Sequence, residues 1–371
     1  MRFAPTPEQE EFRRTVRDLL AGPGAAGKSW AGKSWAGKSW AGKSWTGKSW
    51  EGEPGAADGP GAGEPGAADG PWRALADVGA PALTVPERYG GLGLGAEELV
   101  AVLEETGRAC LPEPLLENTV AARLLADAAP DSPQAAHWLP RFAAGEARLA
   151  LVLPPEPFAV GGAEADLVLV GQGGELYALE SGHAVPVPGV DPGRPPARIE
   201  LPSGRAPLAP ACGPAVERAA LLAALGAAAE LLGAALRMLE LAVAHTGARE
   251  QFGRPVGSFQ AVKHHLADVL MAIEFARPVV LRAAHSFDRG LPSWARDASM
   301  AKVFASDAAE RAARSCLQVH GAIGYTEEHG LARLMRRSWT LSAAWGDAGH
   351  HRAAVAADLL GPAPAPACPP R

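Results

Sequence analysis

A tandem pentapeptide near the N-terminus is the first stretch whose residue types and spacing could do chemistry. Residues 26–50 repeat AGKSW with little variation, so Gly27, four residues, and then Gly32-Lys33-Ser34 fit the phosphate-loop pattern G-x-x-x-x-G-K-[ST]. Such a loop binds phosphates only where a buried strand precedes it and a helix N-terminus follows it. Here a glycine- and proline-rich stretch precedes it and another copy of the repeat follows. An ATP-binding module is therefore the least favoured function.

The neighbouring segment is also of low complexity. EPGAADGP occurs at 53–60 and again at 64–71, and the five-residue period of the first repeat fits neither a helix face nor a strand face. Glycine and proline are frequent in this segment, and only its tryptophan residues could contribute to a hydrophobic core. We predict that 22–71 is a disordered insertion and that the rest of the chain carries the function.

The cysteines offer no chemistry of their own. Cys110, Cys212, Cys316 and Cys368 are scattered along the chain without C-x-x-C spacing. This distribution argues against a zinc site and against a disulfide framework, and it suits a reducing compartment. We therefore expect small core fillers, no metal and a cytoplasmic location.

Bulk composition narrows the possible partners. The chain has 371 residues and 47% hydrophobic content, which are enough for a large core. Its net charge of −6 argues against nucleic acid as a partner. No apolar run is expected to span a membrane, and the N-terminus does not resemble a signal peptide.

Three kinds of local pattern follow one another along the chain. The pattern of residues 1–147 predicts a helical N-terminal domain around the insertion. Residues 148–210 contain short β-type runs and are predicted to form a small β domain; the runs are RLALVLP, ADLVLVGQ, ELYALE and ARIELP. From 211 to 361, long apolar stripes at helical spacing predict a C-terminal helical bundle. Residues 362–371 are expected to form a flexible tail. The predicted fold is mostly α with a small middle β domain.

This layout and two C-terminal segments resemble the acyl-CoA dehydrogenase family. The segments are AREQFGRPVGSFQAVKHHLADV at 248–269 and QVHGAIGYTEEHGLARLMRRSWTLSAAWGDAGHHR at 318–352, supported by PERYGGLGLGAEELVAVLEE before them. The resemblance implies a helical N-terminal domain, a β-barrel-like middle domain, here reduced, and a C-terminal four-helix bundle. It also implies FAD at a subunit interface, an acyl-CoA substrate, and a glutamate that takes the α-proton.

The resemblance assigns cofactor-binding residues in two half-motifs. The first corresponds to Arg249, Phe252 and Gln260, and the second, Q-x-x-G-G-x-G, begins at Gln318. A guanidinium suits pyrophosphate oxygens because it makes two-pronged, charge-assisted bonds. The small residues of the second half-motif allow backbone to approach the adenosine diphosphate. They correspond to Gly321, Ala322 and Gly324, and Ala322 departs mildly from the family pattern.

The chain departs from the family where the proton acceptor belongs. The glutamate position falls on Trp345, and an alternative position used by some members falls on Ala223. Asp347 is the nearest candidate base, although an aspartate there is more typical of a helix cap. His350 and His351 could titrate near neutral pH, but we interpret them as structural.

The middle region departs from the family as well. The loop that touches flavin and substrate in the family has no serine or threonine here, and Glu156 remains in it without an evident partner. The chain thus keeps the residues for a neighbour's cofactor and lacks those for a flavin site of its own.

Three functions follow from these features. The leading one is a subunit that completes a flavin site in a partner, because the chain resembles the short, non-catalytic subunits of heterotetrameric actinobacterial acyl-CoA dehydrogenases of fatty acid or steroid side-chain degradation. The resemblance implies a homo- or heterotetramer and an electron-acceptor flavoprotein. One alternative is a self-sufficient enzyme that uses Asp347 as its base, and another is a flavin-free scaffold subunit.

Overall fold

The computed structural model describes residues 6–21, 34–35, 38–39, 70–180, 182–326 and 329–361. Most of the predicted insertion 22–71 and all of the predicted tail 362–371 lie outside the described residues. Within the repeats, β1 (Ser34–Trp35) pairs antiparallel with β2 (Lys38–Ser39). The disorder predicted for the segment therefore stays a prediction.

Helices precede the middle strands, as the sequence patterns indicate. They are α1 (Pro7–Leu20), α2 (Gly70–Asp77), the 3-10 turn η1 (Glu87–Tyr89), α3 (Ala96–Ala109), α4 (Leu115–Ala128) and α5 (Pro133–Ala143). Thr6 caps α1, because its hydroxyl accepts from the Gln9 N–H while the Gln9 side chain accepts from the Thr6 N–H. α2 begins inside the last two residues of the predicted insertion.

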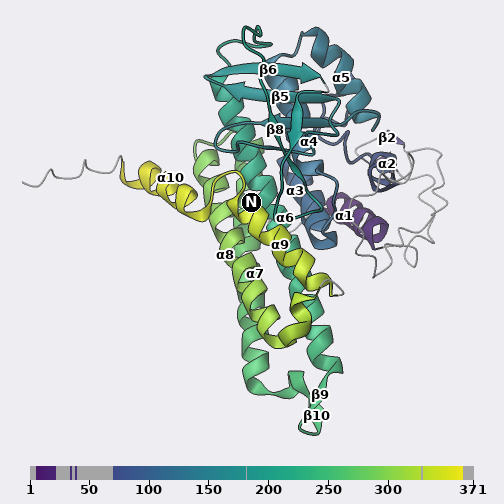
Figure 1. The fold of residues 1–371 in the computed structure, drawn as a ribbon, viewed down its shortest axis with the longest axis vertical. Helices are drawn as coiled ribbons and strands as arrows, with labels where there is room; N and C mark the ends of the chain where they lie inside the picture. Colours follow the sequence, from purple (N-terminus) through teal and green to yellow (C-terminus); the bar gives the residue numbers. More distant parts are fainter. Residues whose placement is uncertain are drawn as a thin grey trace, which may run out of the picture.

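The middle region contains two small sheets, which lie together near one end of the long helices (Figure 1). One has the order β3-β5-β6, with β3 parallel to β5, and the other has the antiparallel order β4-β8-β7. The strands are β3 (Leu149–Val152), β4 (Ala159–Val160), β5 (Leu167–Gln172), β6 (Glu175–Glu180), β7 (Ala184–Pro186) and β8 (Pro196–Ile199). β4 and β7 had no sequence signal because they are only two and three residues long.

Long helices dominate the C-terminal half. They are α6 (Gly213–Ala248), α7 (Gln260–Asp288), α8 (Trp294–His320), α9 (Gly330–Ala343) and α10 (Ala348–Leu360). The hairpin of β9 (Glu250–Gln251) and β10 (Arg254–Pro255) and the 3-10 turn η2 (Val256–Ser258) connect α6 to α7, and η3 (Gly321–Tyr325) follows α8. Figure 1 shows this hairpin at the end of the bundle opposite the sheets, with α10 extending to one side. The domain boundaries predicted from the sequence stay predictions.

Helix α6 corrects one expectation from composition. It is 36 residues long and has an 18-residue window with a mean hydropathy of 1.9, so it is long and apolar enough to cross a membrane. However, 83% of that window is buried within the fold. A helix that packs against neighbours on all sides is apolar all round, which explains why a core helix can have the length and hydropathy of a membrane span.

Two close contacts fix α3 against α6. A Cβ atom on Gly233 would lie 1.8 Å from the Glu104 carbonyl oxygen, and one on Gly107 would lie 2.1 Å from the Glu230 carbonyl oxygen. Only glycine allows the two backbones to approach this closely. The reciprocal glycines therefore set the crossing of the two helices.

Buried ion pairs join the middle region to the helices. Arg194, in the loop between β7 and β8, donates to Glu117 of α4 and to Glu230 of α6, the latter at 2.6 Å. In the same loop, Asp191 accepts from the Arg337 guanidinium of α9. Because these side chains are almost fully buried, removing one partner would leave a buried charge without compensation. The pairs hold the sheets in a fixed position on the bundle.

Candidate functional site

The first half of the site lies where α6 ends. Arg249 caps α6 through its backbone N–H, which donates to the His245 carbonyl at 2.9 Å. The chain then turns between β9 and β10 at Phe252 and Gly253, whose φ angles are 55° and 75°. Two positive φ angles in a row suit a two-residue hairpin turn. This turn leaves the Phe252 side chain 89% exposed.

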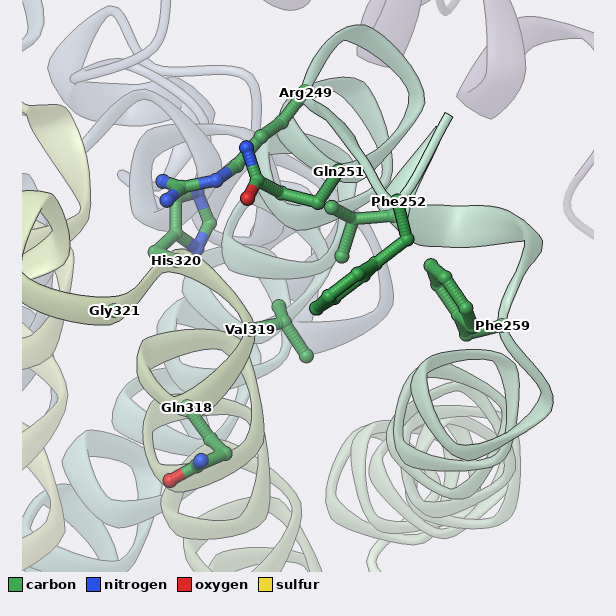
Figure 2. Close-up of a pocket in the computed structure, with 9 residues that line it drawn as sticks. Arg249, Gln251, Phe252, Phe259, Gln318, Val319, His320 and Gly321 are labelled. Carbon is green, nitrogen blue, oxygen red and sulfur yellow. The ribbon is translucent and has the colours of Figure 1, made fainter. Parts of the chain in front are cut away.

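The second half lies where α8 ends. Gln318, Val319 and His320 form the last turn of the helix, and Gly321 ends it with a φ of 70°. A Cβ atom at Gly321 would meet nothing within 4 Å, so glycine is required here by its backbone angle. Figure 2 shows Arg249 and Gln251 extending toward His320 and Gly321 across the space between the two helix ends.

One cavity of about 330 Å³ joins the two halves. The structure brings Arg249, Phe252, Gln318 and Gly321 together around it, although they come from separate elements. Its lining consists of Arg249, Gln251, Phe252, Val256, Phe259, Gln318, Val319, His320 and Gly321.

Three other predicted cofactor residues do not line this cavity. Gln260 is exposed as the first residue of α7, and Ala322 is exposed in η3. Gly324 is buried, and a Cβ atom there would lie 2.9 Å from Leu317. Sequence reasoning missed the aromatic residue Phe259, which faces Phe252 edge-on at 6.0 Å between ring centroids and carries the Arg254 guanidinium over its ring.

The cavity has the chemistry of an anion site with an aromatic wall. Arg249 is exposed, and no carboxylate among the described residues forms an ion pair with it. A guanidinium in this state can bind a diphosphate through two-pronged hydrogen bonds. Phe252 offers an open ring face next to it. At about 330 Å³, the cavity lies at the lower end of the range for small-ligand sites and can enclose only part of a dinucleotide.

A second group of predicted residues meets at the turn between α9 and α10. Trp345 has a φ of 58°, and its side chain is only 3% exposed, packed into the main hydrophobic core. Ala223, the alternative position for a base, is fully buried within α6. An indole has only a donor N–H and alanine has no polar group. Neither position can accept a proton.

Asp347 is the N-cap of α10. Its Oδ1 atom accepts from the His350 N–H at 2.7 Å, so the predicted capping role is confirmed. This bond is the main cause of a lowered pKa for the Asp347 carboxyl, which lies on the surface. The structure gives Asp347 a local structural role as a helix cap, and the nearby His350 and Lys302 also favour its ionised form.

Buried polar side chains fix the turn around Trp345. Lys302 of α8 is fully buried and donates to the Ser342 and Gly346 carbonyls at 3.0 and 2.9 Å, and burial lowers its pKa to about 8. His351 lies 2.9 Å from the Trp345 carbonyl and 3.1 Å from the Ser299 hydroxyl. The structural role predicted for His351 is confirmed by these contacts, and burial lowers its pKa to about 4.

Glu156 has a partner that the sequence did not reveal. Its Oε2 atom accepts from the Trp345 backbone N–H at 3.4 Å, across 189 residues of chain. Burial raises the pKa of Glu156, and the backbone N–H groups of Trp345 and Phe158 oppose that rise. No local pattern could have identified this pairing, because the middle region and the turn meet only in the folded chain.

Known proteins match this chain over most of its length. The acyl-CoA dehydrogenase N-terminal domain family matches residues 53–146, and the C-terminal domain family matches residues 215–360. The acyl-CoA dehydrogenase IpdE2 of Mycobacterium tuberculosis is 41% identical over 269 residues, which cover 72% of this chain and 79% of that protein.

Solved structures share the fold at lower identity. The ChsE4-ChsE5 complex from Mycobacterium tuberculosis has a TM-score of 0.74 at 21% identity, over 98% of this chain and 100% of that chain. A structure of PigA with FAD and proline has a TM-score of 0.73 at 16% identity, over 97% and 99%.

Proposed function

Because the chain belongs to the acyl-CoA dehydrogenase family, we propose that it completes a flavin site with a partner subunit in an enzyme that oxidises the α,β bond of an acyl-CoA thioester. The observation that carries this proposal is the meeting of Arg249 and Phe252 with Gln318 and Gly321 around one open cavity. These are residues that the family resemblance assigns to the cofactor, and they come from two separate helix ends.

The residues present fit part of FAD. The exposed guanidinium of Arg249 suits the diphosphate, and the open ring of Phe252 suits a planar group. When bound, FAD supplies the acceptor for the hydride. The cavity volume of about 330 Å³ leaves the rest of the cofactor to another chain. This division supports a cofactor that is shared between subunits.

The proton acceptor is assigned to the partner because this chain lacks one at both expected positions. Trp345 and Ala223 are buried and have no acceptor group. The nearest carboxylates, Asp347 and Glu156, accept hydrogen bonds from backbone N–H groups. In this chain, those side chains hold the turn between α9 and α10 in place.

The proposed assembly is a heterotetramer with a longer acyl-CoA dehydrogenase chain, located in the cytoplasm and passing electrons to an acceptor flavoprotein. The similarity to one chain of the ChsE4-ChsE5 complex supports a paired subunit, and the IpdE2 relative supports an acyl-CoA substrate. A homotetramer that uses Asp347 and a flavin-free scaffold are the alternatives.

Flavin absorption of the purified chain, alone and co-expressed with an acyl-CoA dehydrogenase from a neighbouring gene, tests these three functions. We expect the chain alone to be colourless and the pair to be yellow and to reduce a dye with a long or steroid-like acyl-CoA. Yellow, active protein from the chain alone would favour the Asp347 enzyme. Colourless protein in both preparations, despite a stable complex, would favour the scaffold.

A further inference from the structure

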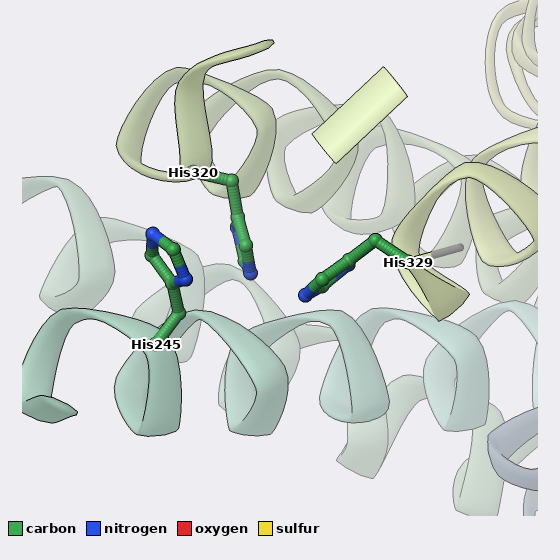
Figure 3. Close-up of side chains that lie close together, drawn as sticks. All are labelled: His245, His320 and His329. Carbon is green, nitrogen blue, oxygen red and sulfur yellow. The ribbon is translucent and has the colours of Figure 1, made fainter. Parts of the chain in front are cut away.

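Three histidines from separate elements converge beside the cavity. His245 lies in the last turn of α6, His320 is the last residue of α8, and His329 immediately precedes α9. One ring nitrogen from each residue lies within 4.8 Å of those of the other two. Figure 3 shows His320 and His329 directing nitrogens toward each other, with His245 beside His320. No pattern along the chain groups these residues.

Two of the rings present buried nitrogens that form no hydrogen bond within the part of the chain that the structure describes. The Nδ1 atom of His320 lies 2.6 Å from the Cys316 carbonyl. A carbonyl can only accept, so Nδ1 carries the proton and Nε2 presents a lone pair. The Nε2 atoms of His320 and His245 are both buried without a partner among the described residues. A buried polar atom without a hydrogen-bond partner destabilises the fold unless a water molecule or an ion binds it.

The surroundings favour the neutral form of these rings. His320 is only 1% exposed, and burial lowers the pKa of both His245 and His320. The Arg249 guanidinium further lowers the pKa of His245, and the His329 ring lowers that of both. Neutral imidazole is the form that binds metal ions. A carbonyl that holds the other ring nitrogen, as Cys316 does for His320, is a typical support for a metal-binding histidine.

His329 can serve as the third ligand beside His245 and His320. Its Nδ1 atom accepts from the Leu331 N–H at 3.2 Å, a long bond at the start of α9. Ligation through Nε2 places the proton on Nδ1 and releases this bond. The ring is half-buried and belongs to the residue just before a helix, so it can turn toward the rings of His245 and His320.

We propose that His245, His320 and His329 bind one divalent transition-metal ion, with Zn²⁺ as the best candidate. Imidazole nitrogens suit Zn²⁺, Ni²⁺ and Cu²⁺. Bond lengths of about 2.0–2.1 Å in a tetrahedral site place ligand nitrogens about 3.4 Å apart. Because the ring nitrogens lie within 4.8 Å of one another, the rings close by at most about 1.4 Å on binding. Three protein ligands leave the fourth position for water or an exogenous ligand.

The ion would hold together the elements that form one wall of the cavity. It would join the ends of α6 and α8 to the start of α9, and His320 itself lines the cavity wall. Arg249, four residues after His245, makes the surroundings electropositive. A metal site here therefore favours a neutral or anionic fourth ligand.

Cobalt binding to the tag-free chain tests the proposal. Chelator-treated protein is titrated with Co²⁺, and visible ligand-field absorption is followed until Zn²⁺ displaces the ion. We expect one Co²⁺ per chain. The variants His245→Gln and His329→Gln should each bind Co²⁺ at least about tenfold more weakly. His137→Gln, at an exposed position on α5, is the matched control and should bind normally.

Two results would overturn the metal site. One is the absence of a saturable equivalent of Co²⁺ in the unmodified chain, and the other is unchanged binding in both His245→Gln and His329→Gln. His329 is half-buried in a loop, so its variant should fold, and circular dichroism verifies this. The titration uses flavin-free protein and measures the metal alone. Its outcome is therefore independent of the proposed role in a flavin site.

Discussion

The Glu156 carboxylate accepts a hydrogen bond from the Trp345 backbone N–H at 3.4 Å, which ties the middle region to the turn between α9 and α10. The turn is held from the other side by Lys302 and His351, which contact the Gly346 and Trp345 carbonyls. All three polar side chains thus bind backbone atoms around an indole that fills the core. These contacts hold the backbone of the turn from both sides.

Glu156→Gln should leave turnover of the assembled enzyme unchanged, because an amide oxygen can still accept from Trp345 and the proposed function assigns the proton acceptor to the partner. Glu156→Ala should lower stability by about 1 kcal/mol, since the Trp345 N–H loses its acceptor. Dye reduction with an acyl-CoA and urea unfolding measure the two effects. A fall in turnover of about 10²-fold or more in Glu156→Gln would identify Glu156 as the base.

Asp347→Asn should have little effect on turnover, because asparagine caps helices about as well as aspartate and only the charge is removed. Asp347→Ala should lower the melting temperature by roughly 1–3 °C through loss of the cap. Steady-state kinetics and thermal unfolding of the two variants separate the roles. If Asp347→Asn loses about 10²-fold or more in turnover while its melting temperature is unchanged, Asp347 is catalytic and the partner-subunit function is wrong.

Arg249→Ala should weaken FAD retention in the assembled enzyme by roughly ten- to a hundred-fold, since a charge-assisted hydrogen bond contributes about 1.5–3 kcal/mol. Arg237→Ala is the matched control: this arginine lies on α6, the helix that Arg249 caps, and pairs with Glu240 at 3.1 Å, away from the cavity lining. Flavin content after gel filtration measures retention. Equal flavin content in both variants would remove Arg249 from the cofactor site.

Stability should fall in acid because of His351. Burial lowers its pKa to about 4, against about 6.5 in an unfolded chain. Between these values the unfolded chain binds a proton that the folded chain does not. His351 therefore leaves the free energy of unfolding undiminished above about pH 6.5. As the pH falls to about 4, the titration of His351 lowers that free energy by about 3 kcal/mol.

The variant His351→Gln isolates this contribution, because glutamine does not titrate. Its free energy of unfolding should depend less steeply on pH over this window than that of the unmodified chain, as measured by urea unfolding. Lys302, His350 and Asp347 also act on His351 and are present in both proteins. Parallel pH profiles would show that His351 does not titrate on unfolding.

Gly233→Ala should destabilise the chain by about 1–3 kcal/mol, because the new methyl group would overlap the Glu104 carbonyl oxygen of α3. Gly247→Ala, near the end of the same helix, meets nothing within 4 Å and should be neutral or stabilising by up to about 1 kcal/mol. Urea unfolding compares the two. Similar effects at both positions would contradict the close crossing of α3 and α6.

Several features of this protein could be predicted from sequence alone. Most of the helices and the longer strands followed from local periodicity, and apolar stripes at helical spacing after residue 211 predicted the long C-terminal helices. The spacing of Arg249, Phe252 and the segment from Gln318 indicated the family. The absence of a proton-accepting side chain at the two positions that the family resemblance assigns to the base was also evident, because Trp345 and Ala223 occupy them.

Tertiary structure alone decided the rest. The partner of Glu156, the burial of Lys302 and the convergence of His245, His320 and His329 depend on which faces of distant elements pack together. Gln260, Ala322 and Gly324 belong to the motif yet lie outside the cavity lining. Local patterns encode backbone conformation and the buried face of each element. The side chains that meet across elements are set by packing, which the periodicity of a single segment does not contain.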